Sequence, residues 1–440
     1  MQPYSSRRTA LLSKLQDGVA IIPSAAQTLR NNDTEHPFRQ NSDFFYLTGF
    51  SEPDAILLLA PQRDGERAIL FLRPRDRAME IWNGKRLGVD SAPSGLAIDA
   101  AFDISEFASR LPDFLVGAEQ LHYRLGSDER LDRQILEAVN TARHRVRRGG
   151  KAPQTFSDPG AILHEMRLFK TPQEIEIMRS AGAITRLGHT AGMQATRPGM
   201  SEFELEAIIE YQYFMNGAQD VAYPSIVAAG DNATILHYNI NRDILRDGDL
   251  VLVDSGAEVD LYAADVTRTW PINGKFTAEQ RAIYEIVLSA QKAGIGKVRP
   301  GNAYSDYHEA AVRVIVEGLL DIGLLHGSFD ENIATEKYRD YYMHNTGHWI
   351  GLDVHDVGRY KDTSSDTYRT LEPGMVMTVE PGIYVHRDLN CDEHFKGIGV
   401  RIEDDVHCTV GGPDNLTESI PKEILELEAL IGSETLVTAV

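Results

Sequence analysis

Two pairs of acidic residues stand inside strongly apolar, strand-like segments of this sequence. Asp254 follows a run of valine and leucine, and Asp265 follows Tyr-Ala-Ala. Glu380 and Glu403 lie in two further strand-like segments. An unpaired carboxylate that is buried in apolar surroundings costs several kcal/mol. We therefore expect cations to lie among these four side chains.

The first pair is predicted to meet across a β-hairpin. Strands at 250–256 and 261–270 are joined by a short polar turn. A turn centred between residues 259 and 260 places Asp254 directly opposite Asp265. Directly opposed side chains lie on one face of a ribbon, with Cβ atoms about 4.5–5.5 Å apart.

The second pair is predicted to meet in the same way. Strands at 375–384 and 398–406 place Glu380 opposite Glu403, but their longer connection leaves this register open. If the two hairpins pack about a pseudo-twofold axis, the four carboxylates converge. Four carboxylates balance two divalent cations, and ions about 3.5–4 Å apart suit bridging carboxylates. The sequence therefore predicts a dinuclear metal cage.

A histidine is expected to complete the cage. Residues 347–358 read GHWIGLDVHDVG and hold His348 and His355 among glycines that allow close backbone approach. Oxygen-rich coordination with a single imidazole favours Mn²⁺ or a similar first-row ion over a structural zinc. Two Mn²⁺ per chain are the expected cofactors, with Zn²⁺ or Co²⁺ as alternatives.

Other catalytic templates are missing from the sequence. It contains no HExxH helix, no Gly-x-Ser-x-Gly elbow, no Gly-x-Gly-x-x-Gly fingerprint and no Walker A loop. Cys391 and Cys408 are its two cysteines, too few for a disulfide framework, which fits a reducing compartment.

The overall composition restricts the partners. The chain has 44 Lys and Arg against 65 Asp and Glu, and its net charge of −21 repels phosphate backbones and anionic lipids. No apolar run approaches the ~18 residues that a spanning helix needs. We expect a cytoplasmic protein without nucleic-acid or membrane partners.

Helices and strands are predicted to recur in the same order after a linker near residue 157. A capping box at Thr171 opens a long helix, and Ser201 caps a second. Thr277 opens the same arrangement again, followed by a helix through 310–320, and Arg-Pro-Gly separates the helices both times. This order predicts a duplicated α+β half.

The first third of the chain is predicted to be a separate α/β domain. Short apolar strands at 55–59 and 68–72 alternate with helical stretches such as 131–142. An arginine-rich run then leads into two glycines and a segment with proline and serine, which marks a boundary. We expect domains at 1–157 and 158–440.

In chain order, the acidic residues and one histidine resemble the ligands of the pita-bread metallopeptidases. This is the family of methionine aminopeptidase, prolidase and aminopeptidase P. Segments 41–50, 164–170, 347–358 and 397–405, together with Trp82, look like the aminopeptidase P branch. One departure lies between His344 and His348, where the intervening residues differ from the family pattern. The matching ligands are Asp254, Asp265, His348, Glu380 and Glu403.

The resemblance implies a fold and an assembly. It implies an α+β protein with a pita-bread catalytic domain at 158–440 and a duplicated α+β half. The α/β domain at 1–157 would narrow access and support oligomerisation. A homo-oligomer is expected, either a tetramer or a dimer.

The resemblance also implies how the metal cage is shared. Asp265 and Glu403 would bridge two ions. Asp254 would complete the coordination of one ion, and His348 and Glu380 that of the other. A hydroxide held between two cations is a nucleophile at neutral pH, and Glu380 would carry its proton to the leaving nitrogen.

Further residues are implied to surround the substrate. His237 would lie beside it, His355 would steady the oxyanion, and His344 with Arg401 would lie near the proline and Glu403. His237, His355 and Arg401 are also expected to act in catalysis with Glu380. The residues expected to bind substrate are His237, His344, His355, Arg401, Trp82 and Tyr384.

The activity implied is hydrolysis of the bond between a peptide's first residue and a penultimate proline. That bond is a tertiary amide without an N–H group, so it needs a dedicated pocket. Prolidase, which shares the ligands but accepts only dipeptides, remains an alternative. A pita-bread fold that serves only as a binding module is a second alternative, although such relatives lose ligands and all five positions are present here.

Overall fold

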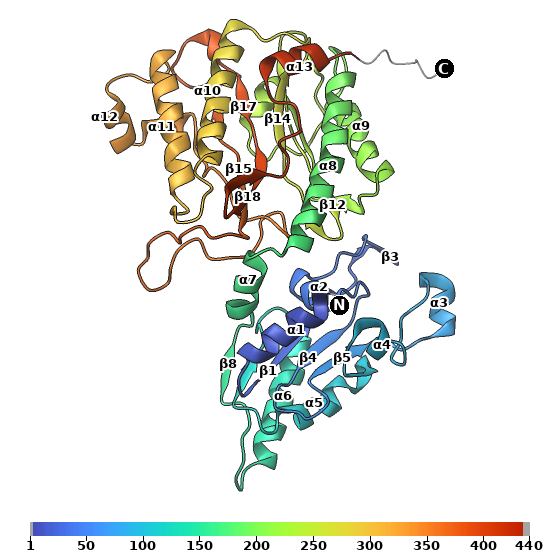
Figure 1. Cartoon of the computed structure of the whole chain (residues 1–440). Coiled ribbons are helices and arrows are strands. Elements are labelled where there is room, and N and C mark those ends of the chain that lie inside the picture. Colours follow the sequence, from blue (N-terminus) through green and yellow to red (C-terminus); the bar gives the residue numbers. More distant parts are fainter. Residues whose placement is uncertain (1–2, 434–440) are drawn as a thin grey trace. The chain divides into compact units, whose positions relative to one another are not determined.

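The computed structural model describes residues 3–433 of the 440-residue chain. The chain forms two compact units, Met1–Met166 and Arg167–Val440, which are drawn in Figure 1. The sequence predicts a boundary after residue 157, and the division in the structure lies later, after Met166. Helix α7 (Gly160–Leu168) contains the division.

The first unit is an α/β domain, as predicted. Its mixed six-stranded sheet has the order β6-β5-β4-β1-β7-β8, and the apolar runs predicted at 55–59 and 68–72 form neighbouring strands. Its strands are β1 (Gly18–Pro23), β4 (Ile56–Leu59), β5 (Ala68–Leu72), β6 (Ala100–Asp103), β7 (Gln120–His122) and β8 (Thr155–Ser157), with a separate pair β2 (Leu29–Asn31) and β3 (Thr34–Glu35). Its helices are α1 (Pro3–Lys14), α2 (Ser42–Thr48), α3 (Arg77–Asn83), α4 (Ala92–Leu96), α5 (Phe107–Leu115) and α6 (Glu129–Arg145).

The second unit repeats a helix pair followed by a three-stranded antiparallel sheet, which confirms the predicted duplication. The sheets have the orders β10-β11-β14 and β15-β18-β19. Thr171 and Thr277 each form the predicted capping box at the start of the first helix of a half. In Figure 1 the helix pairs α8/α9 and α10/α11 flank the central strands.

The elements of the second unit divide between the two halves. The first half contains α8 (Pro172–Ala195), α9 (Glu202–Met215), β9 (Asp220–Val221), β10 (Ile226–Ala229), β11 (Leu250–Asp254), β12 (Ala257–Val259), β13 (Tyr262–Ala263) and β14 (Thr267–Pro271). The second half contains α10 (Ala278–Ile295), α11 (Asp306–Asp321), α12 (Phe329–Ala334), β15 (Val376–Val379), β16 (Gly382–Tyr384), β17 (Gly399–Arg401), β18 (Asp404–Thr409), β19 (Gly412–Asn415) and α13 (Ile424–Leu430).

One large apolar cluster runs through both halves and packs them against each other. It contains Val251 and Val253 from the first sheet, Ile283 from α10, and Val400 from β17. All four side chains are fully buried. Asp254 at the end of β11 and Glu403 just after β17 are therefore attached to well-packed strands.

The predicted register of the first hairpin is wrong by two residues. In the structure Asp254 pairs with Thr267, not with Asp265. The turn lies at Asp260 and Leu261, which both have positive φ values, of 48° and 65°. Two consecutive residues with positive φ form the tight turn that matches the twist of a hairpin. The turn centre is therefore one residue later than predicted.

The predicted register of the second hairpin is correct, although its connection is long. Val379 pairs with Asp404 at the end of one ladder, and Gly382 pairs with Arg401 at the start of the next. Glu380 and Glu403 occupy the gap between these two ladders, where the register places them opposite each other. Among residues 3–433, no helix has the length and apolar character needed to cross a membrane.

Candidate active site

Asp254 and Asp265 converge on one tyrosine hydroxyl despite the shifted register. The Tyr223 hydroxyl lies 2.6 Å from a carboxylate oxygen of Asp254 and 2.6 Å from one of Asp265. The single hydroxyl proton can be donated to one of these oxygens at a time. The second short contact therefore requires a proton or a cation near the two carboxylates.

Two hydrogen bonds to Thr267 connect Glu403 to the half of the second unit that contains Asp254 and Asp265. The Thr267 hydroxyl donates to Glu403 Oε2 at 2.6 Å, and the Glu403 amide donates to the Thr267 carbonyl at 3.1 Å. The Glu380 amide donates to the Thr346 carbonyl at 2.8 Å. Both glutamates thus have a main chain fixed by residues outside their own hairpin. We call Asp254, Asp265, Glu380 and Glu403 the acidic cluster.

His348 faces the acidic cluster with one ring nitrogen. Its Nε2 lies 3.4 Å from Asp265 Oδ2 and 3.6 Å from Glu380 Oε1. Its Nδ1 lies 3.0 Å from the Trp349 carbonyl, which fixes the donor at that nitrogen. Ligand atoms of Asp265, His348 and Glu403 all lie within 4.8 Å of one another. Nε2 is therefore oriented as a cation ligand.

The acidic cluster and His348 line one cavity of about 800 Å³. His237, His344, His355 and Arg401 also line it, and the rings of His348 and His355 lie 4.3 Å apart. Tyrosines form another part of the wall. The tyrosines among the lining residues are Tyr223, Tyr304, Tyr307, Tyr360 and Tyr368.

Arg401 connects the acidic cluster to the neighbouring polar residues. Its guanidinium donates to Asp254 Oδ2 at 2.6 Å, to the Thr267 hydroxyl at 3.0 Å and to the Tyr384 hydroxyl at 3.1 Å. His344 Nε2 lies 2.8 Å from the same Tyr384 oxygen. Burial and the charge of Arg401 lower the pKa of His344 to about 3, so His344 is neutral.

Two residues expected to bind substrate are not among the residues that line the cavity. Tyr384 is fully buried. It is not among the cavity-lining residues, but its hydroxyl contacts His344 and Arg401, which do line the cavity. Trp82 belongs to α3 of the first unit and is 84% exposed. Tyr223 and Thr267 contact the acidic cluster but were not identified from the sequence, because a loop tyrosine and a strand threonine carry no distinctive pattern.

The chemistry of these side chains fits divalent cations. Burial raises the pKa of Glu403 well above its usual range, and repulsion from Asp265 and Glu380 adds to this. Burial raises the pKa of Glu380 to about 7 against the attraction of His348 and Arg401. Burial alone would lower the pKa of His348, but Asp265 and Glu380 raise it to about 9. Without a cation, protons must offset the buried negative charge.

Comparisons with known proteins identify the family of this chain. The model of metallopeptidase family M24 matches residues 176–410, and that of the aminopeptidase P N-terminal domain matches residues 4–123. The chain belongs to metallopeptidase family M24. It is 45% identical to the Xaa-Pro aminopeptidase of Escherichia coli over 98% of this chain and 97% of that protein.

Solved structures of other M24 peptidases share the fold of this one. An aminopeptidase from Pseudomonas aeruginosa superposes with a TM-score of 0.94 at 46% identity, over 97% of each chain. Aminopeptidase P from E. coli in complex with the inhibitor Pro-Leu superposes with a TM-score of 0.93 at 44% identity, over 98% of this chain and 97% of that one. The pita-bread fold and the use of divalent metal by this M24 peptidase follow.

We expect metal to stabilise this M24 peptidase more strongly as the pH rises. In metal-free protein Glu380 holds its proton to about pH 7, whereas the unfolded chain releases it near 4.5. His348 holds its proton to about pH 9 rather than 6.5. The folded state therefore binds more protons than the unfolded state, and its stability falls as the pH rises from about 5 to 9.

A bound cation replaces the protons on Glu380 and His348 and so prevents the loss of stability at high pH. The measurement is the melting temperature at pH 5, 7 and 9, with a chelator or with saturating Mn²⁺. The difference between the two conditions should grow with pH. A difference that shrinks would contradict the proton balance, and effects of groups remote from the cluster cancel because they are common to both conditions.

Proposed function

We propose that this M24 peptidase removes the first residue of peptides whose second residue is proline. The Xaa-Pro aminopeptidase function rests on 45% identity to the E. coli enzyme over nearly the whole chain. The observation that carries the assignment to residues is the convergence of four buried carboxylates and His348 on one wall of the 800 Å³ cavity.

Asp254, Asp265, His348, Glu380 and Glu403 are proposed to hold two Mn²⁺ per chain. Four carboxylates balance the charge of two divalent cations, and the oxygen-rich donor set suits Mn²⁺. Zn²⁺ and Co²⁺ are alternatives with the same ligands. When bound, the cations would supply a nucleophile at neutral pH by lowering the pKa of water.

Glu380 is proposed to move the proton during hydrolysis. Its carboxylate lines the cavity, with 3.6 Å between Glu380 Oε1 and His348 Nε2, and a carboxylate placed beside the attacking water can accept and release a proton. It would take the proton of the attacking water and pass it to the proline nitrogen. His355, whose ring contacts that of His348, is proposed to donate to the oxyanion, and His237 to bind the substrate beside it.

Arg401, His344 and Tyr384 are proposed to form the proline side of the site. His344 is neutral, and it shares the Tyr384 hydroxyl with Arg401. Tyr384 would therefore orient the other two side chains rather than touch the substrate. Proline has no N–H to be recognised, so the pocket must select it by shape.

Three peptides would test the proposed specificity. We expect cleavage of an Xaa-Pro-Yaa tripeptide to exceed that of the matched Xaa-Ala-Yaa peptide by about 100-fold in kcat/KM, because shape selection in a pocket reaches that size. The Xaa-Pro dipeptide tests the prolidase alternative. Equal or better cleavage of the dipeptide than of the tripeptide would favour prolidase. If the Mn²⁺-loaded protein cleaves none of the three peptides, a binding module would be favoured.

We further propose that the peptidase is a cytoplasmic homo-oligomer. The matched aminopeptidase P N-terminal domain and the exposed Trp82 support an access and assembly role for the first unit. The molar mass in solution, measured by light scattering, would distinguish a tetramer or dimer from the monomer of 48.9 kDa.

A further inference from the structure

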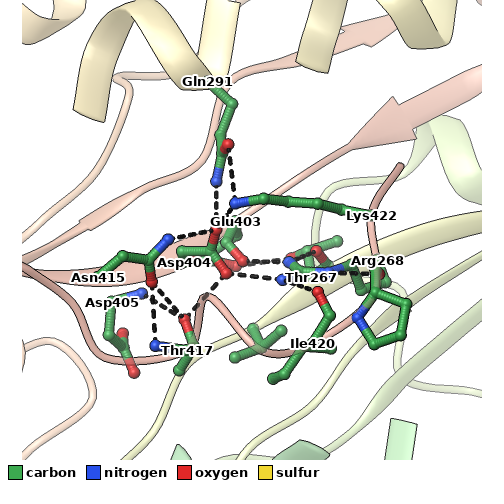
Figure 2. Close-up of polar contacts among 12 residues, drawn as sticks. Thr267, Arg268, Gln291, Glu403, Asp404, Asp405, Asn415, Thr417, Ile420 and Lys422 are labelled. Atoms are coloured by element: carbon green, nitrogen blue, oxygen red, sulfur yellow. Dashed lines mark hydrogen bonds and ion pairs between the residues drawn. The ribbon is translucent and has the colours of Figure 1, made fainter. Parts of the chain in front are cut away.

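A buried network of charged and polar side chains lies directly behind Glu403. At its centre is Asp404, the residue that follows Glu403 in the chain, and Figure 2 shows the groups that converge on it. Asp404 and Arg268 form an ion pair with 2.7 Å between Nη2 and Oδ1, and neither side chain is exposed to solvent. Lys422 forms a second ion pair with Asp404.

Neutral groups complete the environment of Asp404. The Gln291 side-chain amide donates to Oδ2 at 2.6 Å, and that of Asn415 donates to Oδ2 at 3.0 Å. The Thr417 hydroxyl donates to Oδ1 at 2.9 Å. Asp404 therefore accepts from two cationic side chains and three neutral ones, which fixes its carboxylate in place.

Arg268 uses all of its donors in this network. Nη1 donates to the carbonyl oxygens of Glu403 at 2.5 Å and Thr267 at 2.9 Å. Nη2 donates to Asp404 and to the Ile420 carbonyl at 3.1 Å, and Nε donates to the Pro421 carbonyl at 3.1 Å. The guanidinium thus binds backbone carbonyls in three separate segments, at Thr267, at Glu403 and at residues 420–421.

The carbonyls of Thr267 and Glu403 both accept from Arg268, and the same two residues also contact each other at the acidic cluster. Thr267 donates its hydroxyl to Glu403 Oε2, and its carbonyl accepts the Glu403 amide. Thr267 lies in β14 of the first half, and Glu403 precedes β18 of the second. Arg268 therefore locks the backbone at the point where the two halves meet around the Glu403 carboxylate (Figure 2).

Stability alone does not account for such a network. Apolar side chains of similar volume often replace a buried ion pair at no cost, because desolvation offsets the attraction between the charges. A planar guanidinium with five fixed donors does something that apolar residues cannot, since it sets the positions of several carbonyl groups at once.

We propose that Arg268 and Asp404 are positioning residues for the metal site. Asp404 holds the guanidinium of Arg268, which holds the backbone of Glu403 so that its carboxylate is already aimed at the cations. The inference rests on the proposed assignment of Glu403 as a metal ligand. Residues that orient ligands in this way commonly change metal affinity 10- to 100-fold when they are replaced.

The test is the dissociation constant for Mn²⁺ in the full-length chain, measured by competition with a chromogenic chelator. Arg268→Lys keeps a positive charge beside Asp404 but cannot reach all of the carbonyls, so it is the variant chosen to remain folded. We expect its dissociation constant to rise about tenfold. Asp404→Asn leaves Arg268 and Lys422 without a counter-charge, and we expect a larger rise, of up to about 100-fold.

Leu319→Ala is the matched stability control. Leu319 is fully buried on α11, 11 residues beyond the cavity-lining His308 and so about 16 Å further along the helix. It should lower the melting temperature of metal-free protein by at least as much as Arg268→Lys while leaving the Mn²⁺ dissociation constant unchanged. At saturating Mn²⁺ the peptidase activity of Arg268→Lys should recover, because the ligands themselves are intact.

Three outcomes are informative. An Arg268→Lys variant that binds Mn²⁺ within twofold of the wild type overturns the inference. An equal loss of affinity in Leu319→Ala also overturns it, because general destabilisation would then explain both variants. If the wild-type chain itself fails to retain Mn²⁺, the proposed metal assignment fails instead, so the two failures are distinguishable.

Discussion

Replacement of Asp265 or Glu403 by alanine is expected to abolish both metal retention and peptide hydrolysis. Each residue contributes ligand atoms to the group that lies within 4.8 Å around His348. Loss of one of the four carboxylates would leave too little negative charge to balance the proposed divalent cations. Bound cations contribute several kcal/mol to the stabilisation of a hydrolytic transition state, so kcat/KM should fall by about 10⁴-fold or more.

Metal content per chain after gel filtration and the rate of Xaa-Pro-Yaa cleavage are the two measurements. Glu317→Ala is the control, because this carboxylate is exposed on α11. It should retain full metal content and activity. Full activity in either Asp265→Ala or Glu403→Ala would refute the ligand assignment, whatever the metal content.

Replacement of Glu403 by glutamine is expected to change the melting temperature in opposite directions with and without metal. Glu403 is buried beside Asp265 and Glu380, and this raises its pKa well above the usual range. Glu403→Gln keeps the shape and can still accept from Thr267. Glutamine is neutral without taking up a proton, so folding of the metal-free variant no longer requires protonation of a buried carboxylate. We therefore expect this variant to melt at a higher temperature than the wild type in a chelator, and at a lower one with Mn²⁺ present, because a metal ligand is lost.

The acidic cluster could be predicted from the sequence because a register error of two residues leaves each side chain on the same face of the strand. The pairing of Asp254 moves from Asp265 to Thr267, but residues two apart point to the same side of a ribbon. The cluster therefore forms even though the register was wrong. The turn was misplaced because Leu261 adopts a positive φ, which a bulky residue rarely does.

The network behind Glu403 could not be predicted in the same way. Arg268 lies between two threonines in β14, a pattern that is typical of a solvent-facing arginine, yet its side chain has no exposed surface. Its partner Asp404 comes from the second half, and Lys422, which pairs with Asp404, comes from the segment before α13. Only tertiary packing brings these charges together, and no local periodicity records it.

Tyr384 shows a similar limit of family resemblance. The sequence places it at the end of a strand near the substrate, and the structure places its hydroxyl between His344 and Arg401. The position along the chain was correct, but whether a side chain forms the cavity wall or lies behind it depends on packing. Its burial makes an orienting role the better interpretation.

Replacement of Glu380 by glutamine is expected to lower kcat by about 10³-fold at saturating Mn²⁺. General acid–base catalysis by one positioned group contributes about 10²- to 10⁴-fold. Glutamine has the same shape, but its amide cannot take the proton of water and return it to the leaving nitrogen. KM should change much less, because Glu380 is not among the residues proposed to bind the proline.

Two comparisons separate proton transfer from metal binding at Glu380. Glu380→Asp keeps a carboxylate but shortens the side chain, so at saturating Mn²⁺ it should retain more activity than Glu380→Gln. Glu372→Gln, an exposed glutamate before β15, is the control and should behave as the wild type. If Glu380→Gln loses less than tenfold in kcat when fully loaded with Mn²⁺, the proton must travel by another group. His355 would then be the next residue to test, because it lines the cavity beside His348.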